Sequence, residues 1–356
     1  MLGSNQQNNV AFPTIWRGYF LFDTTRKKLE YSGSITTIPI GDDKEMDLKE
    51  IPFGRVFAAS GVQGFFGEGY WFHDPLKHFG LDFDNTTFVA KTTTLKPRPG
   101  NMPLQSDFTP RERMPECIHA RPLRGVALNA IGLSGPGAEV LFKTGRWQKR
   151  VDPFFISFMS TAASRSERNE ELIEFVKLFE FYLPDFYAPV GLQINYSCPN
   201  VGLHVDELLQ EVEAGLLVAS LLDIPLMPKF NVMLPVEAAR EIGNHPLCDA
   251  LCISNTIPYG QLPDKIDWQK LFGSVSPLEK FGGGGLSGKP LLPLVLDWLE
   301  RVRSIGFDKP INAGGGILSV ADGEKVLQAG ADSIFLGSVA FMRPWRVRGI
   351  VKALGV

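Results

Sequence analysis

Short apolar runs alternate with longer amphipathic stretches along most of this chain, and this alternation limits the folds open to it. Eight short runs read as buried β-strands; they end near Ala59, Lys91, Phe158, Asn195, Phe230, Ser254, Ala313 and Leu336. Helix-like stretches lie between several of them, at residues 170–181, 206–222, 236–242, 291–302, 320–329 and 345–354. Strands that alternate with helices pair in parallel, so eight such units predict a closed (β/α)₈ barrel, the TIM barrel.

Three segments exceed what a minimal barrel requires. Residues 1–54 precede the first strand as an N-terminal extension, and residues 55–356 are predicted to form the barrel. Within the extension, residues 16–22 and 28–32 flank Asp23-Thr24-Thr25 and predict a hairpin that closes the barrel floor. Residues 92–125 and 257–289 are predicted as long loops after strands two and six. Because loops at the carboxyl ends of barrel strands build active sites, we expect functional residues there.

Glycine-rich segments fall at the ends of the last barrel units. Gly282 to Gly285 lead into Leu286-Ser287-Gly288, Gly314 to Gly316 follow the seventh strand, and Gly337-Ser338 end the eighth. Bare backbone N–H groups at a helix N-terminus bind anions, and this barrel architecture often holds a phosphate near strands seven and eight. Tight turns also require glycine, and the pattern is neither a GxGxxG fingerprint nor a P-loop. The three clusters together predict a phosphate-binding site.

Two lysines stand at strand ends. Lys91 follows the apolar run Phe88-Val89-Ala90, and Lys229 follows Leu226-Met227-Pro228. Either one alone is explained as a solvated strand end. Two cations at one barrel mouth fit an anionic or electron-accepting cofactor better, because a cation near the pyrimidine end of a flavin stabilises the reduced anion.

Amide side chains and one thiol complete the candidate site. Asn129, Asn195 and Asn255 follow strands, and Asn255 is followed by Thr256. Several amides at one mouth favour a ligand rich in C=O and N–H groups, although a lone Asn is usually a turn residue. The hexapeptide Asn195-Tyr196-Ser197-Cys198-Pro199-Asn200 adds a thiol that could serve as a base or a nucleophile. The alternative is an inert buried cysteine.

Composition excludes several other functions. The net charge of −3 predicts no nucleic-acid or membrane-surface partner. The spacing of Cys117, Cys198, Cys248 and Cys252 fits neither a zinc pair nor a disulfide framework, and Cys248 and Cys252 are expected in the core. The scattered histidines predict no metal site, and a GxSxG elbow is absent from the sequence. We expect neither a signal peptide nor a membrane-spanning helix. Reduced cysteine thiols favour the cytoplasm as the location of the protein.

Several motifs, taken in order, resemble the dihydroorotate dehydrogenase family. They are Ala59-Ser60-Gly61, Lys91-Thr92-Thr93-Thr94-Leu95, Arg98-Pro99-Gly100-Asn101, Asn129-Ala130-Ile131-Gly132-Leu133, the hexapeptide 195–200, Gly284-Gly285-Leu286-Ser287-Gly288-Lys289-Pro290 and Ala313-Gly314-Gly315-Gly316-Ile317. The resemblance extends roughly from Phe57 to Trp345. It implies a flavin mononucleotide (FMN) barrel that oxidises (S)-dihydroorotate to orotate in pyrimidine (UMP) biosynthesis.

The resemblance also implies roles for individual residues. Cys198 would remove the C5 proton while hydride passes from C6 to the flavin, with Lys91 and Asn195 as further catalytic residues. The implied substrate-binding residues are Lys91, Asn129, Ile131, Gly132, Leu133, Asn195, Asn200, Asn255 and Thr256. The implied FMN-binding residues are Ala59, Ser60, Gly61, Lys91, Thr92, Asn129, Asn195, Lys229, Ser254, Ser287, Gly288, Gly314, Gly315, Gly316, Gly337 and Ser338. In having a cysteine as the base, the chain is similar to the soluble class 1 enzymes, whereas the membrane-bound quinone class carries serine at this position.

Some residues depart from the family pattern and leave alternatives open. Ala130-Ile131 and Ser134-Gly135 stand where the family carries Ser-Met and Pro-Asn. An FMN oxidoreductase for another dihydropyrimidine-like cyclic amide, or a non-catalytic flavin-binding relative, is therefore a second hypothesis. The electron acceptor is open among fumarate, quinone and a nicotinamide reached through a partner subunit, since the cysteine pattern holds no iron–sulfur cluster. The resemblance further implies a homodimer, which light scattering would test.

Overall fold

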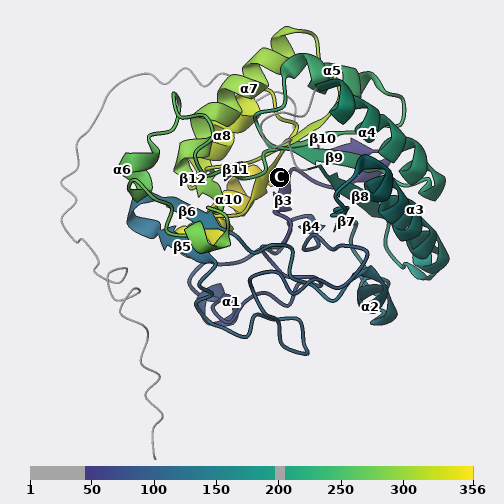
Figure 1. Cartoon of the computed structure of the whole chain (residues 1–356), viewed down its shortest axis with the longest axis horizontal. Coiled ribbons are helices and arrows are strands. Elements are labelled where there is room, and N and C mark those ends of the chain that lie inside the picture. The colour runs from purple at the N-terminus through teal and green to yellow at the C-terminus, as the bar shows by residue number, and fades with distance from the viewer. Residues whose placement is uncertain (1–44, 197–204, 356) are drawn as a thin grey trace, which may run out of the picture. The chain divides into compact units, whose positions relative to one another are not determined.

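The computed structural model describes residues 45–196 and 205–355. Eight parallel strands form one sheet in the order β3-β14-β13-β10-β9-β8-β7-β4 (Figure 1). Their bounds are Val56–Ala58 (β3), Phe88–Val89 (β4), Phe154–Phe158 (β7), Val190–Asn195 (β8), Leu226–Phe230 (β9), Leu251–Ile253 (β10), Ile311–Ala313 (β13) and Ser333–Leu336 (β14). A parallel bridge between Phe57 and Thr87 joins the two end strands, so the barrel closes. The predicted (β/α)₈ barrel and its eight strands are confirmed.

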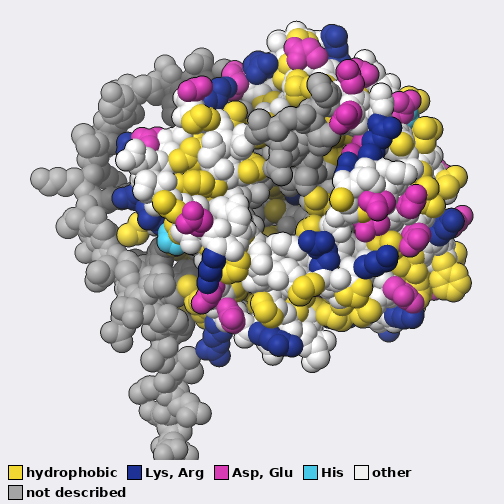
Figure 2. Space-filling view, in the orientation of Figure 1, with side chains coloured by type: hydrophobic (Ala, Val, Ile, Leu, Met, Phe, Trp, Pro, Cys, Tyr) yellow, Lys and Arg dark blue, Asp and Glu magenta, His cyan; other side chains and the backbone are white. Residues whose placement is uncertain are grey.

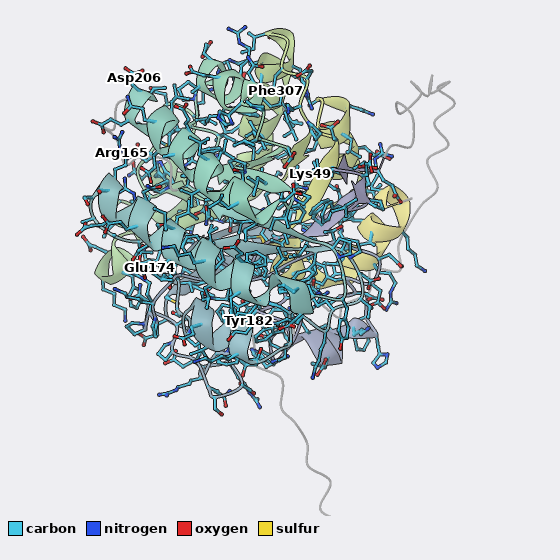
Figure 3. All side chains as sticks on the ribbon, turned by 90° about the vertical axis from the view of Figure 1, so that its right-hand side faces the viewer. Lys49, Arg165, Glu174, Tyr182, Asp206 and Phe307 are labelled. Carbon is cyan, nitrogen blue, oxygen red and sulfur yellow. The ribbon has the colours of Figure 1, made fainter. Side chains whose placement is uncertain are left out.

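Helices follow the barrel strands as the amphipathic pattern predicts. The longer ones are Arg165–Tyr182 (α3), Val205–Ala219 (α4), Val236–Asn244 (α5), Leu292–Ser304 (α7), Val320–Gln328 (α8) and Val347–Leu354 (α10). Helix α3 begins five residues before the predicted stretch because Ser164 and Glu167 form a capping box that supports an earlier first turn. Figure 3 shows α3 and α4 side by side on the barrel flank, where Arg168 and Glu211 form an ion pair with an N–O distance of 2.6 Å.

The two long insertions after the second and sixth barrel strands share a second sheet. Strands Ile118–Arg121 (β5), Val126–Asn129 (β6), Ile257–Pro258 (β11) and Gly285–Gly288 (β12) are antiparallel in the order β11-β12-β6-β5. The segment predicted as a glycine loop thus ends in a strand, which Figure 1 shows beside the barrel. Leu128, Ile257 and Leu286 are fully buried in the core of this sheet. The shorter helices are His73–Lys77 (α1), Ala138–Lys143 (α2), Trp268–Phe272 (α6) and Val339–Met342 (α9).

A small antiparallel hairpin closes the end of the barrel at which the strands begin. It pairs Asp47–Leu48 (β1) with Ile51–Pro52 (β2). Its neighbours Met46 and Phe53 are buried in a cluster with inward-facing residues near the strand starts, among them Phe155. The hairpin expected at residues 16–32 lies outside the described residues, and the domain boundary at residue 54 stays a prediction. In the part of the chain that the structure describes, no helix has the length and apolar character needed to cross a membrane.

Candidate active site

The predicted site residues follow the carboxyl ends of barrel strands. Ser60 and Gly61 lie after β3, Lys91 after β4, Asn255 after β10 and Gly337 after β14, while Asn195 and Lys229 lie within the last residues of β8 and β9. Because the strands are parallel, their carboxyl ends meet at one mouth of the barrel. Figure 2 shows a hollow near the middle of the face that it presents. Cys198 and Asn200 lie outside the described residues.

Lys91 is a buried cation. Its ammonium donates a hydrogen bond to the Ser134 backbone oxygen and lies 4.7 Å from the centre of the Phe65 ring. Burial lowers the pKa of Lys91 to about 8, and the nearby Glu68 carboxylate opposes this shift. The side chain can therefore switch between charged and neutral forms near physiological pH.

Glu68 is a site residue that the sequence reasoning missed. Its carboxylate accepts hydrogen bonds from the Phe65 and Phe66 backbone N–H groups, at 2.9 and 2.7 Å. Tyr70, two residues on, donates to the Gly61 backbone oxygen at 2.6 Å. These bonds fold the loop after β3 against Lys91, and Gly61 lies close to the Lys91 side chain. A charged residue in a glycine-rich loop is too common to mark this role in the sequence.

Lys229 is a second buried cation at the mouth. Burial lowers its pKa, and the Cys252 thiol is the nearby group that opposes this effect. Its ammonium lies 5.3 Å from the centre of the Phe335 ring, and the described residues offer it no hydrogen-bond acceptor. A buried charge is costly without a partner. The position therefore fits an anionic or electron-rich ligand.

The buried cysteines Cys248 and Cys252 are not reactive groups. Cys248 and Cys252 are buried, as predicted. Burial raises the pKa of Cys252 to about 11 and that of Cys248 to about 12. Both thiols are therefore protonated at neutral pH and serve as packing residues.

Two asparagines form a direct pair at the mouth. The Asn255 side chain donates to the Asn195 side-chain oxygen at 2.6 Å, and the Asn255 backbone N–H donates to the Phe230 oxygen at 2.7 Å. The second sheet brings two further predicted residues together, because Gly285 pairs with Asn129 and contacts Thr256. Ile131, Gly132 and Leu133 lie in the loop that follows β6.

A chain of hydroxyl groups runs along the ends of β3, β4 and β7. Ser60 donates to the Ala90 backbone oxygen at 2.8 Å, and its hydroxyl oxygen is 2.9 Å from that of Thr92. Thr92 in turn is 2.9 Å from Ser157, a fully buried residue that the sequence reasoning missed. Ser157 stands inside an otherwise apolar strand, and a polar residue in a buried strand was the available signal.

Two of the three glycine clusters lie in direct contact. A Cβ atom on Gly316 would lie 2.8 Å from both the Gly288 oxygen and the Leu292 nitrogen at the start of α7. The Ser254 backbone N–H donates to the Gly314 oxygen at 3.0 Å, which joins this turn to the end of β10. Gly337 approaches Ala59, and Ser338 precedes α9. Backbone groups free of side chains thus gather near helix starts, an arrangement that can bind a phosphate.

Acidic, thiol and imidazole side chains do not gather into a metal site within the described ranges. No group of three His, Cys, Asp or Glu residues there could hold a metal ion.

Comparison with known proteins adds a separate line of evidence. The chain matches the family model of dihydroorotate dehydrogenase over residues 53–355. The catalytic subunit of dihydroorotate dehydrogenase B (NAD(+)) of Geobacillus sp. is 30% identical over 308 residues, which cover 85% of this chain and 86% of that protein. The subunit of the same name from Cutibacterium acnes is 27% identical over 309 residues, which cover 84% and 87%.

A solved structure supports the fold. The structure of DHODH from Eimeria tenella in complex with ferulenol matches with a TM-score of 0.59 at 20% identity, and the match covers 89% of this chain and 85% of that one. The family match spans nearly the whole barrel, and the sequence motifs fall at the mouth of that barrel. This chain therefore belongs to the dihydroorotate dehydrogenase family, whose members are oxidoreductases that act on a CH–CH group.

Proposed function

We propose that this protein is an FMN-dependent dihydroorotate dehydrogenase that forms orotate for pyrimidine biosynthesis. The observation that carries the proposal is the buried Lys229 ammonium, which the described residues provide with an aromatic face but no hydrogen-bond acceptor. An electron-accepting ring that becomes anionic on reduction is a chemically suitable partner for such a cation. Family membership supports the same reading.

The described residues fit FMN in three respects. Gly288, Gly315 and Gly316 offer bare backbone beside the start of α7, where a phosphate would be held. Ser60 and Thr92 offer hydroxyl groups after the neighbouring strands β3 and β4. Lys229 would stabilise negative charge on the cofactor, and Lys91 would add a second cation. When bound, FMN supplies the acceptor for the hydride that leaves C6 of dihydroorotate.

The substrate is proposed to lie among the amides. Asn195 and Asn255, already joined by a hydrogen bond, would orient a ring rich in C=O and N–H groups. Lys91 would attract an anionic substrate, since it is charged at neutral pH. By family resemblance, Cys198 takes the C5 proton as the base. The acceptor that reoxidises the protein is proposed to be a nicotinamide reached through a partner subunit, because the relatives above are named catalytic subunits of NAD(+) enzymes.

The visible spectrum of the purified protein tests the function directly. A yellow protein that bleaches when dihydroorotate is added without oxygen is the expected result. Fumarate, quinone and nicotinamide with the partner subunit can then be compared as reoxidants. If other dihydropyrimidines bleach the yellow protein and dihydroorotate does not, the result would support another cyclic amide as substrate. The altered loop at 130–135 gives a reason for such a change. A colourless protein that refuses added FMN would overturn the proposal.

The affinity for orotate is expected to fall as the pH rises through about 8. Lys91 is charged below this value and neutral above it, so the attraction for the orotate carboxylate is present at low pH and is lost as pH rises. If binding requires the ammonium, Kd at pH 9 should be about tenfold higher than at pH 7. Titration of the protein with orotate, followed by the flavin spectrum, measures Kd at each pH.

Two lysine variants separate this effect from general alkaline changes. Lys91→Met should bind orotate weakly and with little pH dependence between pH 7 and 9. Lys96→Met removes an exposed lysine from the same loop and should keep the wild-type profile. An unchanged pH profile in Lys91→Met would assign the titration to another group.

A further inference from the structure

We propose that Ser134 is a positioning residue that clamps the loop 98–102 onto the loop 130–135 and thereby holds Lys91 at the substrate side of the mouth. The proposal rests on the proposed function of Lys91 as a substrate-binding group.

Three separate segments meet at Ser134. Its hydroxyl donates to the Ile131 backbone oxygen and accepts from the Met102 backbone N–H, both at 3.1 Å. Its backbone oxygen accepts the hydrogen bond from the Lys91 ammonium. Ser134 is only 1% exposed, so water cannot replace these bonds without movement of the loops. One residue thus joins the two loops through its hydroxyl and binds the buried cation through its backbone oxygen.

Further bonds hold the same pair of loops in register. Arg98 and Gly135 exchange two backbone hydrogen bonds of 2.9 Å each, and the Asn101 backbone N–H donates to the Ile131 oxygen at 2.8 Å. The Asn101 side chain adds a bond of 2.7 Å to the Ala130 oxygen from the exposed side. The loop that carries Ile131, Gly132 and Leu133 therefore cannot move independently of residues 98–102.

Glycine permits this close approach. A Cβ atom on Gly100 would lie 2.2 Å from the Ser134 hydroxyl oxygen and 2.6 Å from the Ile131 backbone oxygen. A Cβ on Gly132 would lie 3.4 Å from the Gly100 Cα. Because Gly100 has a φ of +51°, its backbone also favours glycine. The two loops are built to lie in direct contact, and Ser134 fills the space between them.

Loss of the Ser134 hydroxyl should loosen the clamp where residue 102 meets the loop 130–135. In Ser134→Ala the buried Met102 N–H loses its partner, while the Ile131 oxygen keeps only the bond from the Asn101 N–H. A buried unpaired N–H group is unfavourable enough to open the contact between the loops. Water would then reach Lys91, and the pKa of its ammonium would rise toward that of an ordinary lysine. The substrate would meet a less ordered loop and bind more weakly.

The experiment compares Ser134→Ala, Asn101→Ala and the control Thr144→Val in the flavin-loaded protein. Thr144 makes the same two bonds as Ser134, to the Leu141 oxygen at 2.7 Å and from the Arg146 N–H at 3.2 Å, but follows α2. Anaerobic flavin bleaching against dihydroorotate concentration gives the substrate Kd and the limiting rate. Amine acylation at varied pH, followed by mass spectrometry at Lys91, gives the titration midpoint of that lysine.

Ser134→Ala should raise the substrate Kd about tenfold and change the limiting rate less than about threefold. Its Lys91 acylation midpoint should rise by about one pH unit. Asn101→Ala removes an exposed hydrogen bond and should fold normally. It should raise the substrate Kd and the Lys91 acylation midpoint by less than Ser134→Ala does. Thr144→Val should match the wild type in substrate Kd and in the Lys91 acylation midpoint.

The outcomes are separable. If both loop variants match Thr144→Val in Kd and in the Lys91 midpoint, the clamp is wrong. If Ser134→Ala does not fold, Asn101→Ala decides by the same two values. If dihydroorotate fails to bleach the wild type, the proposed function fails, while the Lys91 midpoint still decides whether Ser134 holds that lysine.

Discussion

Replacement of Cys198 with alanine should leave the flavin bound and slow its reduction by dihydroorotate at least about 10²-fold. The reason is chemical: hydride departure from C6 requires removal of the C5 proton, and alanine offers no base. An ordinary thiol titrates near about 8.5, so the reduction rate of the wild type should rise with pH toward that value as the thiolate forms. Anaerobic stopped-flow measurement of the visible absorbance of the oxidised flavin follows the reaction.

The other cysteines supply a matched control. Cys248→Ala removes a buried thiol whose pKa of about 12 keeps it protonated, and Cys252 is likewise buried. Cys248→Ala should reduce its flavin at the wild-type rate. Near-normal flavin reduction in Cys198→Ala would remove Cys198 from the mechanism and leave the base to be found elsewhere at the mouth.

The Gly288→Ala variant should lose about 3 kcal/mol or more of unfolding free energy. Gly288 has φ 99° and ψ −159°, a conformation that essentially only glycine adopts, which costs another residue about 1–3 kcal/mol. An added Cβ would also lie 2.2 Å from the Gly125 backbone oxygen, which cannot rotate away. Because Gly288 abuts Gly316, FMN affinity should fall as well. Urea unfolding and flavin fluorescence measure the two effects.

Gly273 separates the backbone cost from the steric clash. It has nearly the same conformation, φ 101° and ψ −172°, but nothing lies within 4 Å of an added Cβ. Gly273→Ala should therefore lose only the backbone cost, about 1–3 kcal/mol, and should bind FMN normally. Equal losses in the two variants would show that the turn at Gly288 can move to accept a methyl group.

The barrel was predictable because its signal is local. Each barrel strand is a short apolar run, and each long helix has a periodic apolar face, so neither requires knowledge of distant partners. The second sheet was not predictable in this way. Its strand β6 pairs with β12, and Leu128 faces Leu286 across more than a hundred residues of chain. Such pairing depends on how the barrel brings two insertions together, which no local pattern records.

The candidate site likewise contains residues that local sequence patterns predict and residues that they do not. Motifs at strand ends identified Lys91, Asn195, Lys229 and the glycine clusters, since parallel strands direct all their carboxyl ends to one mouth. Glu68 and Ser157 were missed because their importance comes from the groups beside them, namely backbone N–H donors for Glu68 and the Thr92 hydroxyl for Ser157. The role proposed for Cys198 comes from the motif and the family alone.

By itself the sequence determined the eight-stranded barrel, the mouth at which its polar strand ends gather, and the family. These follow from residue order, because periodicity and strand-end motifs are properties of neighbouring residues. The tertiary structure alone decided that burial brings the pKa of Lys91 to about 8, that Asn255 bonds to Asn195, and that Ser134 joins two loops. Desolvation and hydrogen bonding depend on distances between groups far apart in the chain, and folding sets those distances.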